Sequence, residues 1–154
     1  WQTVNMGKVR TLGTDLTLQS KWHIATHHAL SLSLNYSLQQ SCDYTSPTLT
    51  TWHKQLAYTP IHSGGGSATW HNPWANLVMH ATFASMRWCT NNHIATTDLP
   101  AYSEWGIIFR NIGIGQSMLT ARIDLINLFD KRYEVIGNYP MPGRAYKITL
   151  NYSF

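Results

Sequence analysis

The fold of this chain is decided by its last ten residues, which read Ala145-Tyr146-Lys147-Ile148-Thr149-Leu150-Asn151-Tyr152-Ser153-Phe154. From Tyr146 onward, apolar and polar side chains alternate without a break, so an extended strand would have one wholly apolar face and one wholly polar face. A helix, with its period of 3.6 residues, would spread both kinds around its circumference. The segment therefore predicts a β-strand that separates an apolar environment from a polar one.

The same alternation recurs upstream and predicts further strands. Leu30, Leu32, Leu34, Tyr36 and Leu38 alternate with Ser31, Ser33, Asn35, Ser37 and Gln39. Following the pattern along the chain predicts seven strands, at about 8–22, 29–42, 58–71, 74–87, 102–112, 117–130 and 145–154. Each is about ten residues or longer, which is enough to cross a bilayer when the strand is tilted.

The predicted connections alternate in length. Short links fall near Trp22 to His28, at Asn72-Pro73 and around Gly113 to Gln116, and long ones span about 43–57, 88–101 and 131–144. Outer-membrane barrels have this habit, with short periplasmic turns and long external loops. The sequence thus favours an all-β, antiparallel, up-and-down transmembrane β-barrel segment. A soluble β-sandwich binding module, for example for carbohydrate, is the alternative, because a sheet with one solvated face alternates in the same way.

Composition narrows the function classes. Only 12% of the residues are charged, against roughly 25% in typical soluble domains. The formal net charge of +4 comes from scattered Lys and Arg, which argues against nucleic-acid binding because that function usually needs a clustered basic surface. No apolar stretch approaches the roughly 20 residues of a membrane helix. The N-terminus lacks an export signal, so we expect a processed chain or part of a longer one.

The faces and ends of the predicted strands suggest how they meet a membrane. We expect Leu30, Leu32, Leu34, Ile123, Leu125, Ile148 and Leu150 to face lipid, and Ser31, Asn35, Arg122, Asp124, Lys147 and Asn151 to face the lumen. Aromatic residues lie near strand ends, as interfacial girdles require: Trp22, Trp70, Trp74, Trp88, Trp105, Tyr133, Tyr146 and Phe154. Ordinary core packing is the alternative for these rings.

Metal and catalytic sites are not indicated. The pair His27-His28 lacks an HExxH or CxxC companion, so we expect no metal and no cofactor. Cys42 and Cys89 could form a disulfide in an oxidising compartment, or remain two thiols that pack as small apolar groups. No G-x-S-x-G elbow is present, so an outer-membrane enzyme is a weak alternative. The run Gly64-Gly65-Gly66 suggests a strand kink or a close backbone approach.

The C-terminal region carries a family resemblance. Asn127-Leu128-Phe129-Asp130-Lys131-Arg132-Tyr133, then Tyr139-Pro140-Met141-Pro142-Gly143-Arg144-Ala145-Tyr146, and finally Tyr152-Ser153-Phe154 together resemble the closing hairpin of TonB-dependent receptors. Upstream, Asn5-Met6-Gly7-Lys8-Val9-Arg10-Thr11-Leu12-Gly13 and Tyr58-Thr59-Pro60-Ile61-His62-Ser63-Gly64 resemble the starts of earlier barrel strands. Asp130 suits a turn, and Gly143 permits backbone conformations that other residues resist.

The resemblance implies import of a scarce ligand, such as a siderophore, cobalamin or haem, across the bacterial outer membrane. Barrels of this class have about 22 strands and a plugged lumen. Residues 1–154 would be the C-terminal portion of such a barrel, and nothing in them resembles the plug domain or the TonB box. The implied partners are outer-membrane lipid, the rest of the barrel and plug, TonB through the N-terminal part, and the imported small ligand.

Seven strands cannot close a simple bacterial barrel, since such barrels have an even number of strands. We therefore expect the sheet to be completed by missing sequence or, in a split-barrel structural subunit, by a second chain.

Two groups of residues remain as candidate sites. The final strand, with Tyr146, Ile148, Leu150, Tyr152 and Phe154 on its apolar side, is a candidate address for the barrel-assembly machinery. Ligand contacts are expected in the long loops, where stacking and hydrogen-bonding side chains gather: Tyr44, Trp52, His53, Trp88, Asn91, Asn92, His93, Tyr133 and Tyr139.

Overall fold

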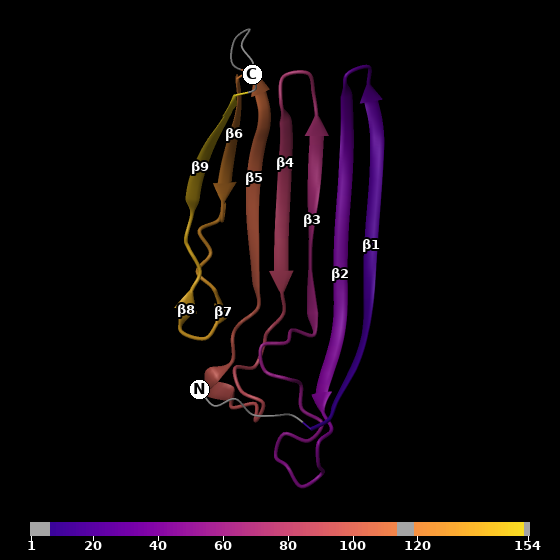
Figure 1. The fold of residues 1–154 in the computed structure, drawn as a ribbon, viewed down its shortest axis with the longest axis vertical. Coiled ribbons are helices and arrows are strands. Elements are labelled where there is room, and N and C mark those ends of the chain that lie inside the picture. Colours follow the sequence, from indigo (N-terminus) through magenta and orange to yellow (C-terminus); the bar gives the residue numbers. More distant parts are fainter. Residues whose placement is uncertain (1–6, 114–118, 153–154) are drawn as a thin grey trace.

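A computed structural model describes residues 7–113 and 119–152 and contains one large antiparallel sheet. Its seven strands follow the chain order, and they are β1 (Val9–Ala25), β2 (His28–Asp43), β3 (His62–His71), β4 (Asn76–Ala84), β5 (Tyr102–Gly113), β6 (Leu119–Ile126) and β9 (Ala145–Tyr152) (Figure 1). A separate small ladder joins β7 (Glu134–Ile136) to β8 (Tyr139–Pro140).

One short 3-10 helix, η1, covers Ala95–Thr97. Within the described part of the chain, no helix is both long and apolar enough to span a membrane.

The seven predicted strands are confirmed, although the first extends to Ala25 and the third, fourth and sixth are shorter than predicted. The third begins at His62 and not at 58, because Tyr58 has a positive φ of 59° and Pro60 lacks the N–H that a ladder needs. The fourth begins at Asn76, since the side-chain oxygen of Asn72 accepts hydrogen bonds from the backbone amides of Trp74 and Ala75 and holds them in a turn. The sixth ends at Ile126, because Asn127 adopts a φ of 51°.

The β7–β8 hairpin was not predicted and lies within the expected loop 131–144.

The two ends of the sheet differ as the connection lengths predict. The short β1–β2 and β3–β4 links lie at one end, and the long segments 44–61, 85–101 and 127–144 lie at the other, below the sheet in Figure 1. The predicted link around Gly113 to Gln116 falls largely outside the described residues, as does Phe154. We call these two ends the short-turn end and the long-loop end.

Strand register places the two predicted side-chain sets on opposite faces. Leu18, Leu34, Gly66, Ala81 and Trp105 form one continuous row across five strands. Opposed residues in an antiparallel ladder point to the same side, so this row defines an apolar face that includes Ile123, Leu125, Ile148 and Leu150. The neighbouring row, with Ser33 and Ser67, belongs to the polar face.

The apolar face is uncovered in the described structure. Leu34, Ile148 and Leu150 are 42%, 70% and 60% exposed. The stretch Leu30 to Leu38 along β2 measures about 26 Å at roughly 3.3 Å per residue, close to the apolar band of about 25 Å in outer-membrane barrels. A β-sandwich would bury this face under a second sheet, and the described residues form no such layer. The sandwich alternative is therefore wrong.

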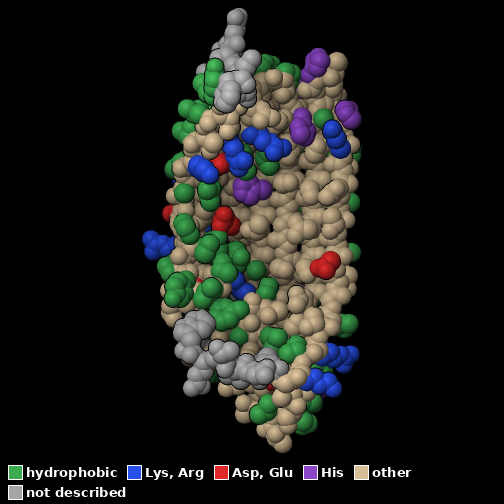
Figure 2. All heavy atoms as spheres, viewed as in Figure 1, with side chains coloured by type: hydrophobic (Ala, Val, Ile, Leu, Met, Phe, Trp, Pro, Cys, Tyr) green, Lys and Arg blue, Asp and Glu red, His purple; other side chains and the backbone are tan. Residues whose placement is uncertain are grey.

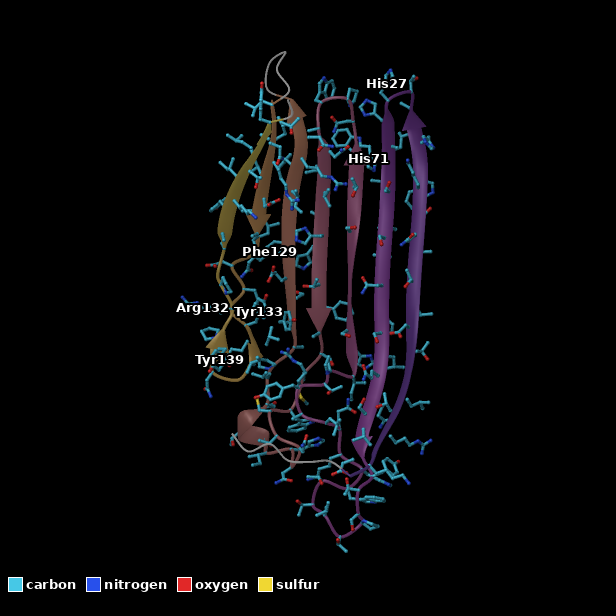
Figure 3. All side chains as sticks on the ribbon, in the orientation of Figure 1. His27, His71, Phe129, Arg132, Tyr133 and Tyr139 are labelled. Carbon is cyan, nitrogen blue, oxygen red and sulfur yellow. The ribbon has the colours of Figure 1, made fainter. Side chains whose placement is uncertain are left out.

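The polar face is shown in Figure 2. Uncharged polar side chains and backbone occupy most of it, and histidine and basic side chains gather toward the short-turn end. His27 lies at the β1–β2 turn and His71 at the end of β3 (Figure 3). Arg122 and Asp124 form an ion pair of 2.7 Å here, on the face predicted for them.

The apolar face is hollowed where β3 carries glycine. A Cβ on Gly66 would stand 2.5 Å from Leu34 Cδ2, so the leucine side chain occupies the space that another residue would fill. The resulting groove measures about 620 Å³ and is walled by Leu34, Tyr36 and Phe83. A Cβ on Gly65 would also lie 2.8 Å from the carbonyl oxygen of Ala81, so the expected close backbone approach at the glycine run is confirmed.

The aromatic prediction is partly right. Trp22, Trp70 and Trp74 lie at the short-turn end and are 47%, 41% and 73% exposed. Trp105 and Tyr146 belong to the apolar face, and Phe129 packs edge-on against Trp105. Trp88 and Tyr133 do not join a girdle, because both pack against other rings among the long loops.

A buried asparagine fixes the connection to the last strand. Asn127 is 1% exposed, and its amide donates to the carbonyls of Lys131 and Pro142 while its side-chain oxygen accepts from Lys131 N. Asp130 Oδ1 accepts a hydrogen bond from Arg144 N, and a Cβ at Gly143 would meet that oxygen at 2.8 Å. Asn127, Asp130 and Gly143, which belong to the motif that resembles TonB-dependent receptors, thus join the two ends of the β6–β9 connection. We call these three residues the clasp.

Candidate functional site

The long-loop end gathers most of the buried polar side chains of the described structure. Ser41, Asp43, Gln55 and Arg87 are each 7% exposed or less. In the sheet, by contrast, both faces are largely open. A site that recognises a ligand is built more readily where side chains are held in place, so we describe the long-loop end from its first loop onward.

In the first long loop, three of the predicted ligand residues form one ring cluster. The centre of the Tyr44 ring lies 5.1 Å from that of Trp52 and 4.5 Å from that of His53. The rings of Trp52 and His53 stack with their centres 4.7 Å apart. Asp43 shapes the loop by accepting hydrogen bonds from Thr45 N and Thr51 Oγ1. His53 adopts a positive φ of 62°, which turns the chain back toward β2.

The second long loop binds the first through polar contacts. The ring of His93 stacks on Trp88 at 4.4 Å, and His93 Nε2 lies 2.7 Å from the carbonyl of Gln55. Asn91 Oδ1 accepts from Ala57 N, and the carbonyl of Asn92 accepts from Lys54 Nζ. These four residues were predicted as ligand contacts. Polar groups of Asn91, Asn92 and His93 hold the two loops together, whereas Trp88 contributes the ring on which His93 stacks.

The third long connection joins this assembly through aromatic and charged groups. Tyr133 stacks on Tyr102 at 4.2 Å and donates a hydrogen bond to Glu104. Burial, together with the Glu104 carboxylate beside it, raises the pKa of Tyr133 well above its usual value. Arg87 donates to the carbonyls of Pro100 and Glu134. Figure 3 places Tyr133 on the connection between β6 and β9.

Tyr139 does not join these clusters. It lies in the β7–β8 hairpin and is 64% exposed (Figure 3). As a ligand contact it stays a prediction, because its ring is free to stack on a bound molecule.

The two cysteines are unbridged. Cys42 is buried beside Gln55, and Cys89 lies near the hydroxyl of Tyr58 and the backbone of Gly137. The disulfide considered from the sequence is therefore not formed. Burial, followed by the hydrogen bond with Cys89, raises the pKa of Tyr58.

Two hollows open among the long loops. One of about 530 Å³ is lined by Tyr58, Cys89, Asp98 and Glu134. The other, of about 450 Å³, lies over the polar face of the sheet and is lined by Ser37, Ser63, Arg87 and Tyr102. Within the described ranges no three His, Cys, Asp or Glu side chains come close enough to hold a metal ion. The arrangement can bind a small molecule by stacking and hydrogen bonding.

Sequence reasoning missed Gln55, Arg87, Tyr102 and Glu104. Gln55 accepts from Ser41 N and is buried, and the other three form the link between loops described above. No periodic signal marks a single arginine in a loop, because its burial depends on residues far away in the chain.

The comparisons with known proteins agree with this architecture. Residues 1–128 match the family model described as TonB dependent receptor-like, beta-barrel. No match is found among curated protein sequences.

Solved structures resemble the chain in fold. The siderophore receptor PiuA from Acinetobacter baumannii superimposes with a TM-score of 0.71 at 16% identity, over 92% of this chain and 21% of that one. The ferric citrate transporter FecA, in the unliganded form, gives a TM-score of 0.68 at 17% identity, over 90% of this chain and 23% of that one. The ferric yersiniabactin uptake receptor FyuA from Yersinia pestis gives a TM-score of 0.61 at 14% identity, over 90% of this chain and 22% of that one. The chain thus spans about a fifth of the length of these proteins.

Proposed function

Because this chain belongs to the TonB-dependent receptor-like β-barrel family, we propose that it forms the C-terminal wall of an outer-membrane uptake receptor, and is no enzyme. One observation carries the proposal: one face of the sheet is predominantly apolar across all seven strands, while every long described connection lies at one end. A barrel wall has these properties because one face meets lipid and one end meets the exterior.

The open sheet is completed, in this proposal, by further strands. In the described structure β1 and β9 each pair on one side only. The outer edges of these two strands would pair with the first and intermediate strands of a barrel of about 22 strands. The remainder of the receptor would supply the plug that fills the lumen and the segment that contacts TonB.

The ligand that we propose is a ferric chelate. The similar solved structures are a siderophore receptor, a ferric citrate transporter and a ferric yersiniabactin uptake receptor. The long-loop end has stacked rings and hydrogen-bonding groups that could contact such a chelate. The proposed contacts remain Tyr44, Trp52, His53, Trp88, His93 and Tyr139.

Uptake of labelled iron tests the function. The full-length protein is expressed in cells that lack their own ferric chelate receptors, and entry of radioactive iron is followed with TonB present and absent. We expect TonB-dependent uptake of at least one ferric chelate, and purification only in detergent. Uptake of cobalamin or haem in place of iron chelates would reassign the ligand, and copurification of a second polypeptide carrying the missing strands would favour the split-barrel alternative.

We also propose that β9 is the address read by the barrel-assembly machinery. Ile148, Leu150 and Tyr152 are 60% to 70% exposed on its apolar side, and β9 is the outermost strand of the described sheet. An incoming edge can add to such a strand through backbone hydrogen bonds. Phe154→Ser in the full-length protein should slow membrane insertion; unchanged insertion with lower stability of the inserted protein would leave only a girdle role for Phe154.

A further inference from the structure

Arg87 is a charged side chain enclosed at the long-loop end. It is 3% exposed, and its guanidinium carbon lies 4.9 Å from the centre of the Tyr102 ring. Nη2 donates to the carbonyls of Pro100 and Glu134, at 3.3 and 3.1 Å. These contacts fix the plane of the guanidinium group, because they hold it between two loops and an aromatic face.

No carboxylate neutralises this charge in the described structure. The ion pair found there is Arg122–Asp124, on the sheet. Nε of Arg87 is buried without a hydrogen-bond partner, and the guanidinium hydrogen bonds to described residues are both made by Nη2. Glu104 and Glu134 are engaged elsewhere, by Tyr133 and by the backbone amide of Asn138. A buried cation without a counter-ion is costly, which indicates that an anion belongs beside it.

A hollow lies next to this group and contains no acid. Its volume is about 450 Å³, and Arg87 is the one charged residue among its lining side chains. Asn35, Ser37, Ser63 and Tyr58 add hydroxyl and amide groups to the same wall. The hollow lies over the polar face of β2 to β5, where the row of Ser37, Ser63 and Ala84 meets the long loops. It can therefore accept part of a small polar molecule.

We propose that this hollow is an anion subsite in which Arg87 pairs with a carboxylate or phenolate oxygen of the imported ligand. The proposal rests on the uptake function and deepens it, because it specifies negatively charged chelates. Arginine suits the role, since its planar fork remains charged and binds oxygen pairs with defined geometry. The hydroxyls of Ser37 and Ser63 would donate to further oxygens of the same group.

Binding by the detergent-solubilised full-length protein tests the subsite. Tryptophan fluorescence is titrated with ferric citrate, an anionic carboxylate chelate, and with ferrioxamine B, a cationic hydroxamate chelate. We expect the wild type to prefer ferric citrate and Arg87→Met to lose about 10-fold to 100-fold of that affinity, since hydrogen bonds to charged groups contribute on this scale. Arg87→Lys should lose less, and affinity for the cationic probe should not fall.

A second variant separates binding from folding. Ser63→Asp supplies a carboxylate within the hollow while leaving Arg87 in place, so it should abolish preference for ferric citrate without lowering thermal stability. Arg110→Met is the matched control, because it removes one exposed positive charge from the polar face outside the hollow. Its affinity for ferric citrate should stay within about twofold of wild type, as expected for a screened, distant charge.

The outcomes distinguish the two proposals. If the wild type imports iron but Arg87→Met and Ser63→Asp bind ferric citrate normally, the subsite is wrong and the uptake function stands. If Arg87→Met loses stability but binds ferric citrate normally, Arg87 serves only its contacts with Pro100 and Glu134, and the subsite is again wrong. If the wild type binds and imports no chelate, both proposals fail.

Discussion

The sheet and the long-loop end of this chain are specified in different ways. In the sheet, backbone ladders join neighbouring strands, and side chains are sorted to two open faces. At the long-loop end, segments far apart in sequence are joined by buried polar side chains, such as Asn127 and Arg87. A ladder tolerates many side chains provided that the alternation is kept, whereas a buried polar group depends on particular partners.

The largest expected effect is that of a charged residue placed at the middle of the apolar face. Leu34→Arg places a charge where lipid is expected, and it should destabilise the full-length barrel by about 2 to 4 kcal/mol. Ser33→Arg, one residue away on the polar face, should cost much less. Folding titrations into lipid vesicles measure both. Equal destabilisation would show that the two faces do not meet different environments.

At the long-loop end, the clasp provides the corresponding test. Asn127→Ala removes one acceptor and the donor to two carbonyls, and should lower the free energy of unfolding by about 2 to 3 kcal/mol because buried backbone groups lose partners. Asn151→Ala, on the polar face of β9, should change it by less than about 0.5 kcal/mol. If both changes had the same effect, the clasp would contribute no more than an exposed residue.

A smaller effect is expected where a loop side chain binds a strand. Tyr133→Phe deletes the hydroxyl that donates to Glu104 but keeps the stack on Tyr102, and it should cost about 1 to 2 kcal/mol. Thermal unfolding of the detergent-solubilised protein measures the loss. A gain in stability would mean that burial of the hydroxyl outweighs its hydrogen bond.

The same tyrosine predicts a pH dependence. Its pKa is raised in the folded protein, so above the unfolded value of about 10 the unfolded chain releases a proton that the folded chain keeps. The contribution of Tyr133 to the free energy of unfolding is fully present below about pH 10. It falls as the pH rises further, by at most about 1.4 kcal/mol per pH unit. Comparing wild type with Tyr133→Phe between pH 8 and 11.5 isolates this contribution. Parallel curves would contradict the assignment.

The sequence by itself determined the strands, their two faces and the alternation of short and long connections. Each of these follows from the period-two pattern and from turn residues such as Asn72 and Pro73, which act on their immediate neighbours. It also provided the closing motif, although not the reason why Asn127, Asp130 and Gly143 occur together.

Only the tertiary structure decided what the loop side chains do. It showed that Trp88 packs on His93 within a loop, that Tyr133 packs on Tyr102 at the start of β5, and that the two cysteines are unbridged. It also brought Arg87 beside Tyr102 and the carbonyl of Glu134, 47 residues further along the chain. Contacts of this kind depend on where strands place distant loops, and no local pattern of residues encodes that placement.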